Sequence, residues 1–214
     1  RTPLSVILSS VECCHNRDFD QQEKFIKIIR QESLRMSSLI NDMLTLTSSD
    51  NHRFSIRKRE TELDTLLMNV YESFEPLAKE KSLFLSMELP ENILPLCCCD
   101  PDRVIQAVSI LLHNAISYTP EKGKINLSLS YKKGAFEKGS FVISVKDNGI
   151  GISEKDKEKI FDRFYRAEKS RSAKGHFGLG LSIASEIVNA HRGSLLVKDA
   201  PGGGSIFVIT LPDQ

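Results

Sequence analysis

The sequence of 214 residues has no tryptophan, no hydrophobic run long enough to span a membrane and no surplus of one charge. Its 29 Lys and Arg residues balance 28 Asp and Glu residues, which leaves a net charge of +1. Such a balance gives no indication of a nucleic-acid-binding surface or a polybasic membrane-binding arm. We therefore expect a soluble globular chain that makes no direct contact with nucleic acid and, over this segment, none with a membrane.

Cysteine is scarce, and its five positions are poorly spaced for a structural role. Cys13 and Cys14 are adjacent, Cys97, Cys98 and Cys99 are consecutive, and no Cys-x-x-Cys pair occurs. Because side chains alternate along a strand, three consecutive cysteines cannot converge on one metal ion. The odd total also argues against a disulfide framework. We interpret all five as small apolar packing residues of a protein in a reducing compartment.

Glycine is absent from the first fifty residues, and proline occurs there once. Apolar residues recur at steps of three and four in two series, on either side of a polar break at residues 15–18. This spacing predicts two helices, the second capped by Asp20 with Glu23 in the capping-box position. Two helices alone bury little surface, so residues 1–50 are predicted to form a helical hairpin that dimerises into a four-helix bundle. Packing of the hairpin on the rest of its own chain is the alternative.

From residue 51 onward, strand and helix patterns interleave, and we predict a second domain over residues 51–214. Helical stripes cover residues 62–81, 101–118 and 179–190, and the second of these starts with Asp100 as cap and Pro101 in the first turn. Alternating or apolar runs predict strands at residues 54–57, 83–89, 96–99, 124–131, 140–146, 194–198 and 205–211. The fold class is therefore α+β, with helices on one face of a mostly antiparallel sheet.

Three local patterns in this second domain could carry chemistry. Asp147 follows an apolar strand and is succeeded by Gly149 and Gly151. A carboxylate there can accept a hydrogen bond from an exocyclic amine while glycines let a ring approach the backbone, although the same residues also make an ordinary turn. Asn114 lies inside an apolar helical segment, where it is either a satisfied core residue or a ligand to a hard cation such as Mg²⁺.

The third pattern is the glycine-rich run 175–181, which leads into a predicted helix. Glycines before a helix N-terminus expose backbone N–H groups to an anion. The run is not a Walker A loop, because no Lys-Ser/Thr pair follows its last glycine. It is not a dinucleotide-binding fingerprint either, because no parallel strand precedes it at the required spacing. Taken alone, it is weak evidence of a phosphate site.

Taken together, these patterns resemble a known family. The order Asn114-Ala115, then Asp147-x-Gly149-x-Gly151, then Phe161-x-x-Phe164-Tyr165, then Gly178-Leu179-Gly180-Leu181 is similar to the N, G1, F and G2 boxes of sensor histidine kinases of two-component systems. The opening Arg1-Thr2-Pro3-Leu4 resembles the end of the family's H box, His-Glu-x-Arg-Thr-Pro-Leu. The resemblance covers essentially the whole chain.

The resemblance implies a fold and a set of site residues. The catalytic domain would be an α/β sandwich of the Bergerat type, and the hairpin would form half of a dimeric four-helix bundle. Asn114 would coordinate Mg²⁺, and Arg166 would approach the γ-phosphate of ATP. The nucleotide-binding residues would be Asn114, Tyr118, Asp147, Gly149, Gly151, Phe161, Tyr165, Gly178, Leu179 and Gly180. Among these, Asp147 would bind the adenine amino group and Tyr118 would lie against the ring, with residues 155–174 as the ATP lid.

The implied activity is that of a protein histidine kinase. ATP would phosphorylate a histidine on the first helix, and the phosphoryl group would pass to an aspartate of a response regulator. The phosphoacceptor would stand just before Arg1, so we expect it upstream of this sequence. Thr2 falls where relatives with phosphatase activity place a water-orienting residue. The full-length protein would be anchored in the cell membrane, with this segment in the cytoplasm.

Three departures from the family pattern leave an alternative open. Ile110 stands where the family usually has a second Asn, Ser117 replaces a common basic residue, and His176-Phe177 replaces a pair of small residues. The alternative is a kinase-deficient, nucleotide-binding relative that acts as a response-regulator phosphatase or scaffold. A chaperone- or topoisomerase-type ATPase fits less well, because Ile110 cannot activate water as the glutamate of those enzymes does.

Overall fold

The computed structural model describes residues 2–14, 19–50, 56–133, 139–167 and 178–213. The chain divides into two compact units, residues 1–52 and 53–214, and each is described by itself.

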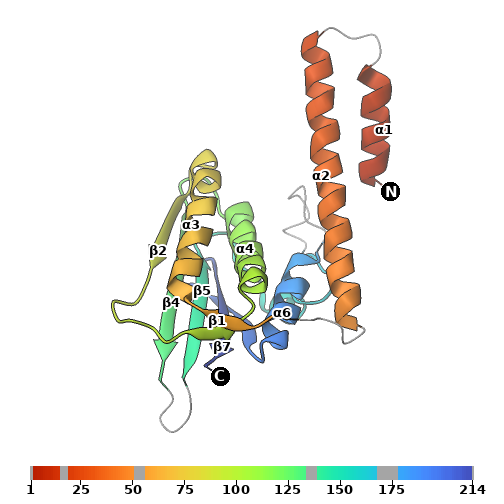
Figure 1. Ribbon diagram of the computed structural model, residues 1–214. Coiled ribbons are helices and arrows are strands. Elements are labelled where there is room, and N and C mark those ends of the chain that lie inside the picture. The colour runs from red at the N-terminus through yellow and green to blue at the C-terminus, as the bar shows by residue number, and fades with distance from the viewer. Residues whose placement is uncertain (1, 15–18, 51–55, 134–138, 168–177, 214) are drawn as a thin grey trace. The chain divides into compact units, whose positions relative to one another are not determined.

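The first unit is a helical hairpin. Helix α1 (Thr2–Cys14) packs against helix α2 (Phe19–Asp50), as Figure 1 shows. Leu4, Leu8 and Val11, at helical spacing on α1, are each about half exposed within this unit. The predicted cap of the second helix is wrong, because Asp20 already lies inside α2. An apolar stripe therefore remains open along α1.

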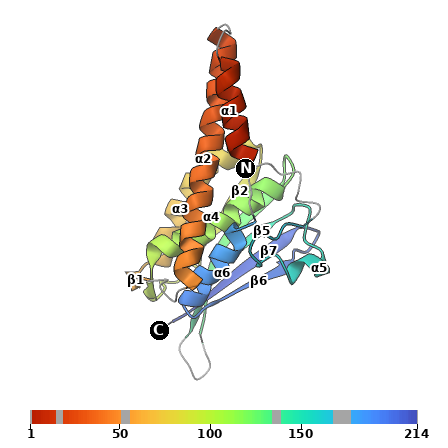
Figure 2. The ribbon, with the colours of Figure 1, turned by 90° about the vertical axis from the view of Figure 1, so that its right-hand side faces the viewer.

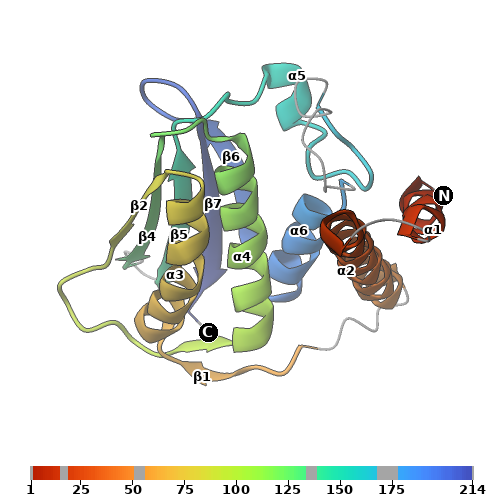
Figure 3. The ribbon, with the colours of Figure 1, turned by 90° about the horizontal axis from the view of Figure 1, so that it is seen from above.

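The second unit is built on a five-stranded sheet in the order β2-β4-β5-β7-β6. Its strands are β2 (Phe84–Glu88), β4 (Lys124–Lys132), β5 (Ser140–Asp147), β6 (Ser194–Asp199) and β7 (Ser205–Pro212). Only β2 and β4 pair in parallel, and the other neighbours are antiparallel. Helices α3 (Leu63–Glu80), α4 (Pro101–Tyr118) and α6 (Gly180–Ala190) cover one face of this sheet, which Figure 3 shows from above. The α+β architecture predicted from the sequence is confirmed.

The core lies between this sheet and its helices. Alternate residues of the two central strands are buried, among them Phe141, Ile143 and Val145 on β5 and Phe207 and Ile209 on β7. They pair across the sheet in register, with Val145 opposite Phe207 and Ile143 opposite Ile209. Because successive side chains of a strand point to opposite faces, this alternation turns one whole face of the sheet toward the helices.

The start of α4 follows the prediction in atomic detail. The Asp100 carboxylate accepts a hydrogen bond from the Arg103 N–H at 3.2 Å, and Pro101 occupies the first turn, where its missing N–H costs no hydrogen bond. The cap fixes where the helix begins. The helix then runs without interruption to Tyr118, so the cap also sets the position of every side chain on α4.

A second, two-stranded sheet pairs β1 (Arg59–Thr61) with β3 (Cys97–Cys99). The strand predicted at residues 54–57 is wrong in its described part, because Ile56 and Arg57 precede β1 and belong to no strand. The Arg57 N–H instead donates to the Asp100 carboxylate at 2.7 Å. A side-chain acceptor thus replaces a strand partner at this point.

The packing role predicted for the cysteines holds only in part. Cys97 and Cys99 are buried and Cys98 is half-buried, but Cys13 is exposed within its own unit. These four are free thiols, and Cys14 lies among the residues whose side chains are not described. Within the described ranges, no group of His, Cys, Asp and Glu could hold a metal ion, and no helix has the length and hydrophobicity to cross a membrane.

A pair of neighbouring substitutions on α3 tests this core. Leu67 is fully buried, whereas Met68 beside it is 46% exposed. We expect Leu67→Ala to lower the free energy of unfolding by about 3 kcal/mol, because it leaves a cavity under the sheet. Urea denaturation followed by circular dichroism measures the change. Met68→Ala is the matched control, with an expected loss below about 1 kcal/mol; equal losses in the two variants would contradict this packing.

Candidate functional site

A buried carboxylate stands at the end of β5. Asp147 is 4% exposed, and its side chain accepts three hydrogen bonds from within the domain. The Gly149 N–H donates to Oδ1 at 2.8 Å, the Ser205 N–H to Oδ1 at 3.3 Å, and the Ser205 hydroxyl to Oδ2 at 2.5 Å. A buried charge needs such donors, and together they hold the carboxylate in one orientation.

Glycines let the backbone close around this carboxylate. A Cβ on Gly149 would collide with the carbonyl oxygen of Tyr118, and one on Gly204 would collide with the backbone of Asp147. Gly151 adopts a φ of +67°, which a residue with a side chain rarely takes. The Ile150 N–H donates to the Tyr118 carbonyl at 3.3 Å, so the Asp147 turn is fastened to the end of α4.

Helix α4 joins this turn to the second glycine cluster. Ile110, Asn114 and Tyr118 follow one another at intervals of four residues and therefore share a face of the helix. Tyr118 touches the Asp147 turn, while a Cβ placed on Gly180 would lie 3.1 Å from the Cγ2 atom of Ile110. Asn114, half-buried, stands between these two contacts.

The second cluster lies where the chain enters α6. Gly178 has a φ of +76°, and a Cβ there would lie 2.6 Å from the carbonyl oxygen of Tyr165. The Phe164 N–H donates to the Gly178 carbonyl at 2.9 Å, and Phe164 itself has a φ of +64°. Leu179 is buried, so it could meet a ligand only through its backbone. The segment around Phe164 and Tyr165 is thus held against the first turn of α6.

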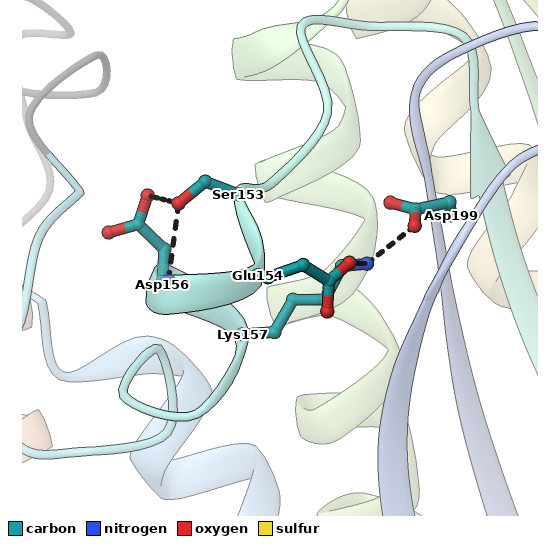
Figure 4. A network of polar contacts seen from close by, with 5 residues as sticks. All are labelled: Ser153, Glu154, Asp156, Lys157 and Asp199. Atoms are coloured by element: carbon teal, nitrogen blue, oxygen red, sulfur yellow. Dashed lines mark hydrogen bonds and ion pairs between the residues drawn. The ribbon is translucent and has the colours of Figure 1, made fainter.

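Between the two clusters, the chain forms the short helix α5 (Glu154–Lys157), which Figure 2 shows at one end of the sheet. The Ser153 hydroxyl accepts a hydrogen bond from the Asp156 N–H and donates to its carboxylate at 2.6 Å. Lys157 reaches both Glu154 and Asp199 at 2.6 Å, as Figure 4 shows. The two carboxylates, Asp199 first, raise the pKa of Lys157. The start of the predicted lid is therefore tied to the end of β6.

Other predicted residues are placed less directly. Phe161 packs edge-on against Phe207, with ring centroids 6.5 Å apart. It also lines a hollow of about 400 Å³ between α5 and β6, together with Lys155 and Lys157 of the predicted lid but with no other predicted nucleotide-binding residue. In contrast to this hollow, the Asp147 turn and the start of α6 each bring predicted residues into contact. Tyr165 donates to Asp156 at 2.7 Å.

Three predicted features lie at the limits of the described chain. Arg166 is half-buried and directly follows Tyr165. Thr2 is in the first turn of α1, and its side chain is outside the described positions, as are residues 168–177 with the second half of the lid and His176-Phe177. Their predicted roles stay predictions.

Ser205 is the site residue that the sequence patterns missed. It belongs to β7, whereas Asp147 belongs to β5, and its hydroxyl makes the shortest contact to the carboxylate. The run Gly202-Gly203-Gly204-Ser205 predicts a hairpin turn but does not indicate a contact with Asp147. The need of a buried carboxylate for donors was the clue that could have led to it.

Comparison with known proteins identifies the family of the chain. The family model of the His Kinase A (phospho-acceptor) domain matches residues 1–52, and that of the histidine kinase-, DNA gyrase B- and HSP90-like ATPases matches residues 99–214. The sensor histidine kinase WalK of Bacillus subtilis is 34% identical over 216 residues, which cover 99% of this chain. The chain belongs to the sensor histidine kinases.

Two solved structures have a similar fold. Full-length ShkA in complex with AMPPNP is 26% identical, with a TM-score of 0.73 and coverage of 99% of this chain and 43% of that one. ThkA in complex with the response regulator protein TrrA is 25% identical, with a TM-score of 0.75 and coverage of 99% and 58%. The histidine kinase chain described here spans about a third of the length of WalK, 34%.

The hydroxyl of Ser205 offers a test of the Asp147 turn. Ser205→Ala removes the donor to Asp147 Oδ2 and leaves a buried carboxylate short of a partner, so we expect a loss of about 1.5–3 kcal/mol in the free energy of unfolding. Chemical denaturation at neutral pH measures it. Ser128→Ala, on the half-buried face of β4, is the control and should change stability by less than about 0.5 kcal/mol. No difference between the two variants would show that the Ser205 contact is unimportant.

Proposed function

We propose that this chain is the kinase core of a two-component sensor histidine kinase. It would use ATP to phosphorylate a histidine upstream of Arg1 and then transfer the phosphoryl group to an aspartate of a response regulator. The observation that carries the proposal is the orientation of the Asp147 carboxylate by Ser205 and Gly149, at the end of the helix that carries Asn114. The names of the similar proteins favour this function over that of a kinase-deficient relative.

The Asp147 turn suits the adenine base of ATP. Its carboxylate is an acceptor, and the adenine amino group is a donor. Gly149 and Gly151 leave the backbone open to a flat ring, and Tyr118 lies at the edge of the same turn. That full-length ShkA was solved with AMPPNP supports a nucleotide in this position.

The start of α6 suits the phosphates. Its first N–H groups have no partner within the helix, and the dipole of an 11-residue helix favours an anion at this end. Gly178, Leu179 and Gly180 would offer these N–H groups. Arg166 would add positive charge from the lid, which the Lys157 contacts and the Tyr165–Asp156 hydrogen bond fasten on the side of the sheet.

Asn114 fits the requirements of a Mg²⁺ ion bound together with ATP. It offers an amide oxygen, and the preceding turn offers only the apolar Ile110. Mg²⁺ takes one or two protein oxygens and fills its remaining positions with phosphate oxygens and water. When bound, Mg²⁺ would neutralise charge on the phosphates, and Asn114 would hold it between the two glycine clusters.

The reaction depends mainly on the positions of the reacting groups. A neutral imidazole nitrogen would attack the γ-phosphorus, an N–P bond would form, and the bond to the leaving oxygen of ADP would break. Aligning these atoms and neutralising the phosphate charge supplies most of the catalysis. The phosphohistidine would then meet the receiver domain of a response regulator, and the complex of ThkA with TrrA supports a partner of this kind.

The hairpin would supply the dimer interface. Leu4, Leu8 and Val11 leave an apolar stripe open on α1, which a second hairpin could cover. Thr2, in the first turn of α1, would orient water for dephosphorylation of the response regulator. The longer protein would be anchored in the cell membrane, with this segment on the cytoplasmic side.

Nucleotide binding is tested by Asp147→Asn. The amide presents donors where adenine and Ser205 also present donors, so we expect affinity for Mg-ATP to fall at least about tenfold. Isothermal titration calorimetry measures the affinity. Asp102→Asn removes the same charge from the exposed first turn of α4 and should leave affinity unchanged. A weaker binding in both variants would mean that net charge, and not the adenine contact, is responsible.

Phosphorylation is tested on a longer version of the protein that includes the histidine expected before Arg1. Incubation with labelled Mg-ATP should give a protein label that is lost in acid, retained in alkali and absent from the Asp147→Asn variant. These stabilities are those of phosphohistidine.

The absence of label, with ATP binding intact, would reject the kinase function. Loss of phosphate from a phosphorylated response regulator, dependent on Thr2, would then indicate the phosphatase alternative.

A further inference from the structure

A buried histidine joins two helices at the end of the domain that lies away from the proposed nucleotide site. His191, at the C-terminus of α6, is 2% exposed. Its Nε2 atom lies 2.9 Å from the backbone nitrogen of Asp100, and its Nδ1 atom lies 2.7 Å from the carbonyl oxygen of Ile187. Because a backbone N–H can only donate and a carbonyl can only accept, the ring carries its proton on Nδ1 and accepts through Nε2.

Asp100 connects this contact to two further segments. Its carboxylate caps α4 through the Arg103 N–H and also accepts a hydrogen bond from the Arg57 N–H at 2.7 Å. Arg57 lies in the segment that follows the hairpin unit and leads into β1. One buried residue, 7% exposed, thus fastens the incoming chain, the start of α4 and the end of α6.

The two helices run antiparallel. The C-terminal end of α4 and the N-terminal end of α6 therefore both lie at the proposed nucleotide site. The start of α4 meets the end of α6 at Asp100 and His191, while Ile110 of α4 meets Gly180 at the start of α6. Figure 3 shows the two helices side by side. From Asp100 to Asn114 the helix extends roughly 20 Å. A shift or tilt at the Asp100 end therefore changes where Asn114 and Tyr118 stand relative to Gly178–Gly180.

We propose that His191 is a positioning residue for nucleotide binding, which holds α4 and α6 in register only while its imidazole is neutral. The proposal rests on the nucleotide site proposed above. His191 touches neither base nor phosphate, and it acts through Asp100 and the two helices. Protons would thereby loosen the nucleotide site from a distance.

The charges around the ring set the direction of this effect. Burial, and then the positive charge of Lys58 ahead of β1, lower the pKa of His191 from its ordinary 6.5, while the Ile187 carbonyl and the Asp100 carboxylate partly oppose them. The folded domain therefore takes up this proton less readily than the unfolded chain. The stability that neutral His191 confers is complete above about pH 6.5 and is lost as the pH falls through the lowered pKa.

Protonation would also redistribute the hydrogen bonds of Asp100. The second N–H of an imidazolium would face the Asp100 N–H, which would lose its acceptor. The new cation would instead attract the Asp100 carboxylate, in competition with the Arg57 and Arg103 N–H groups. The cap of α4 and the attachment of the incoming chain would weaken together.

Two substitutions separate the neutral acceptor from the titration. Gln at position 191 retains an oxygen near the place of Nε2 and cannot take up a proton, whereas Asn reaches only as far as Nδ1 and cannot accept from Asp100. We measure Mg-ATP affinity by calorimetry from pH 7.5 to pH 5.5 for the wild type, His191→Gln and His191→Asn. ATP itself titrates in this range, so each wild-type value is divided by that of His191→Gln at the same pH.

Wild-type affinity should fall about fivefold or more relative to His191→Gln over this range, and His191→Asn should bind weakly already at pH 7.5. Parallel curves for the wild type and His191→Gln, or normal binding by His191→Asn, would overturn the proposal. If either variant does not fold, NMR of the wild type decides: the His191 ring nitrogens and the Asp100 and Asn114 amides should titrate together. An independent Asn114 signal would reject the coupling, and a wild type that binds no ATP at any pH would reject the proposed function instead.

Discussion

The buried negative charge of Asp147 is the constraint on which the site depends. A carboxylate that is 4% exposed must be surrounded by donors, and the chain supplies them from its own turn and from β7. To bring those donors close, Gly149 and Gly204 must lack side chains, because a Cβ at either position would collide with backbone. The two turns and the pairing of β5 with β7 thus form one arrangement around a single charged group.

Helix α4 distributes the effect of this arrangement over the domain. Together with its N-cap Asp100, this helix carries the contact of Ile110 with Gly180, the amide of Asn114 and the Tyr118 carbonyl that fastens the Asp147 turn. Because a capped, uninterrupted helix behaves as a rigid rod, these features keep fixed distances from one another. At the position of the departure from the family pattern, Ile110 fills the space with an apolar side chain that lies against the start of α6.

Features that depend on the local residue pattern were predicted from the sequence, whereas features that depend on pairing between distant segments were missed. Alternation located the central strands, and Asp100-Pro101 located the start of α4. The order of the motifs, which is a resemblance and not a pattern of local physics, located Asp147 and the glycines. Ser205 was missed because its partner lies 58 residues away in the chain. The strand Arg59–Thr61 was missed because its three polar residues alternate in no recognisable way and become a strand only beside Cys97–Cys99. Cys13 was interpreted as a packing residue from its apolar character alone, and it is exposed within the hairpin unit.

The place of β7 between β5 and β6 has a consequence for the order in which the protein is made. The hairpin α1–α2 and the β4–β5 pair join neighbouring segments and can form on a growing chain. The pairing of β5 with β7 joins residues that are 60 (Lys146 and Ile206) to 72 (Ser140 and Pro212) positions apart, so it is complete only after residue 212 has left the ribosome. Since β7 also brings Ser205 to Asp147, the Asp147 turn is among the last parts to be completed during synthesis. The hairpin can therefore form on the growing chain before the surroundings of Asp147 are complete.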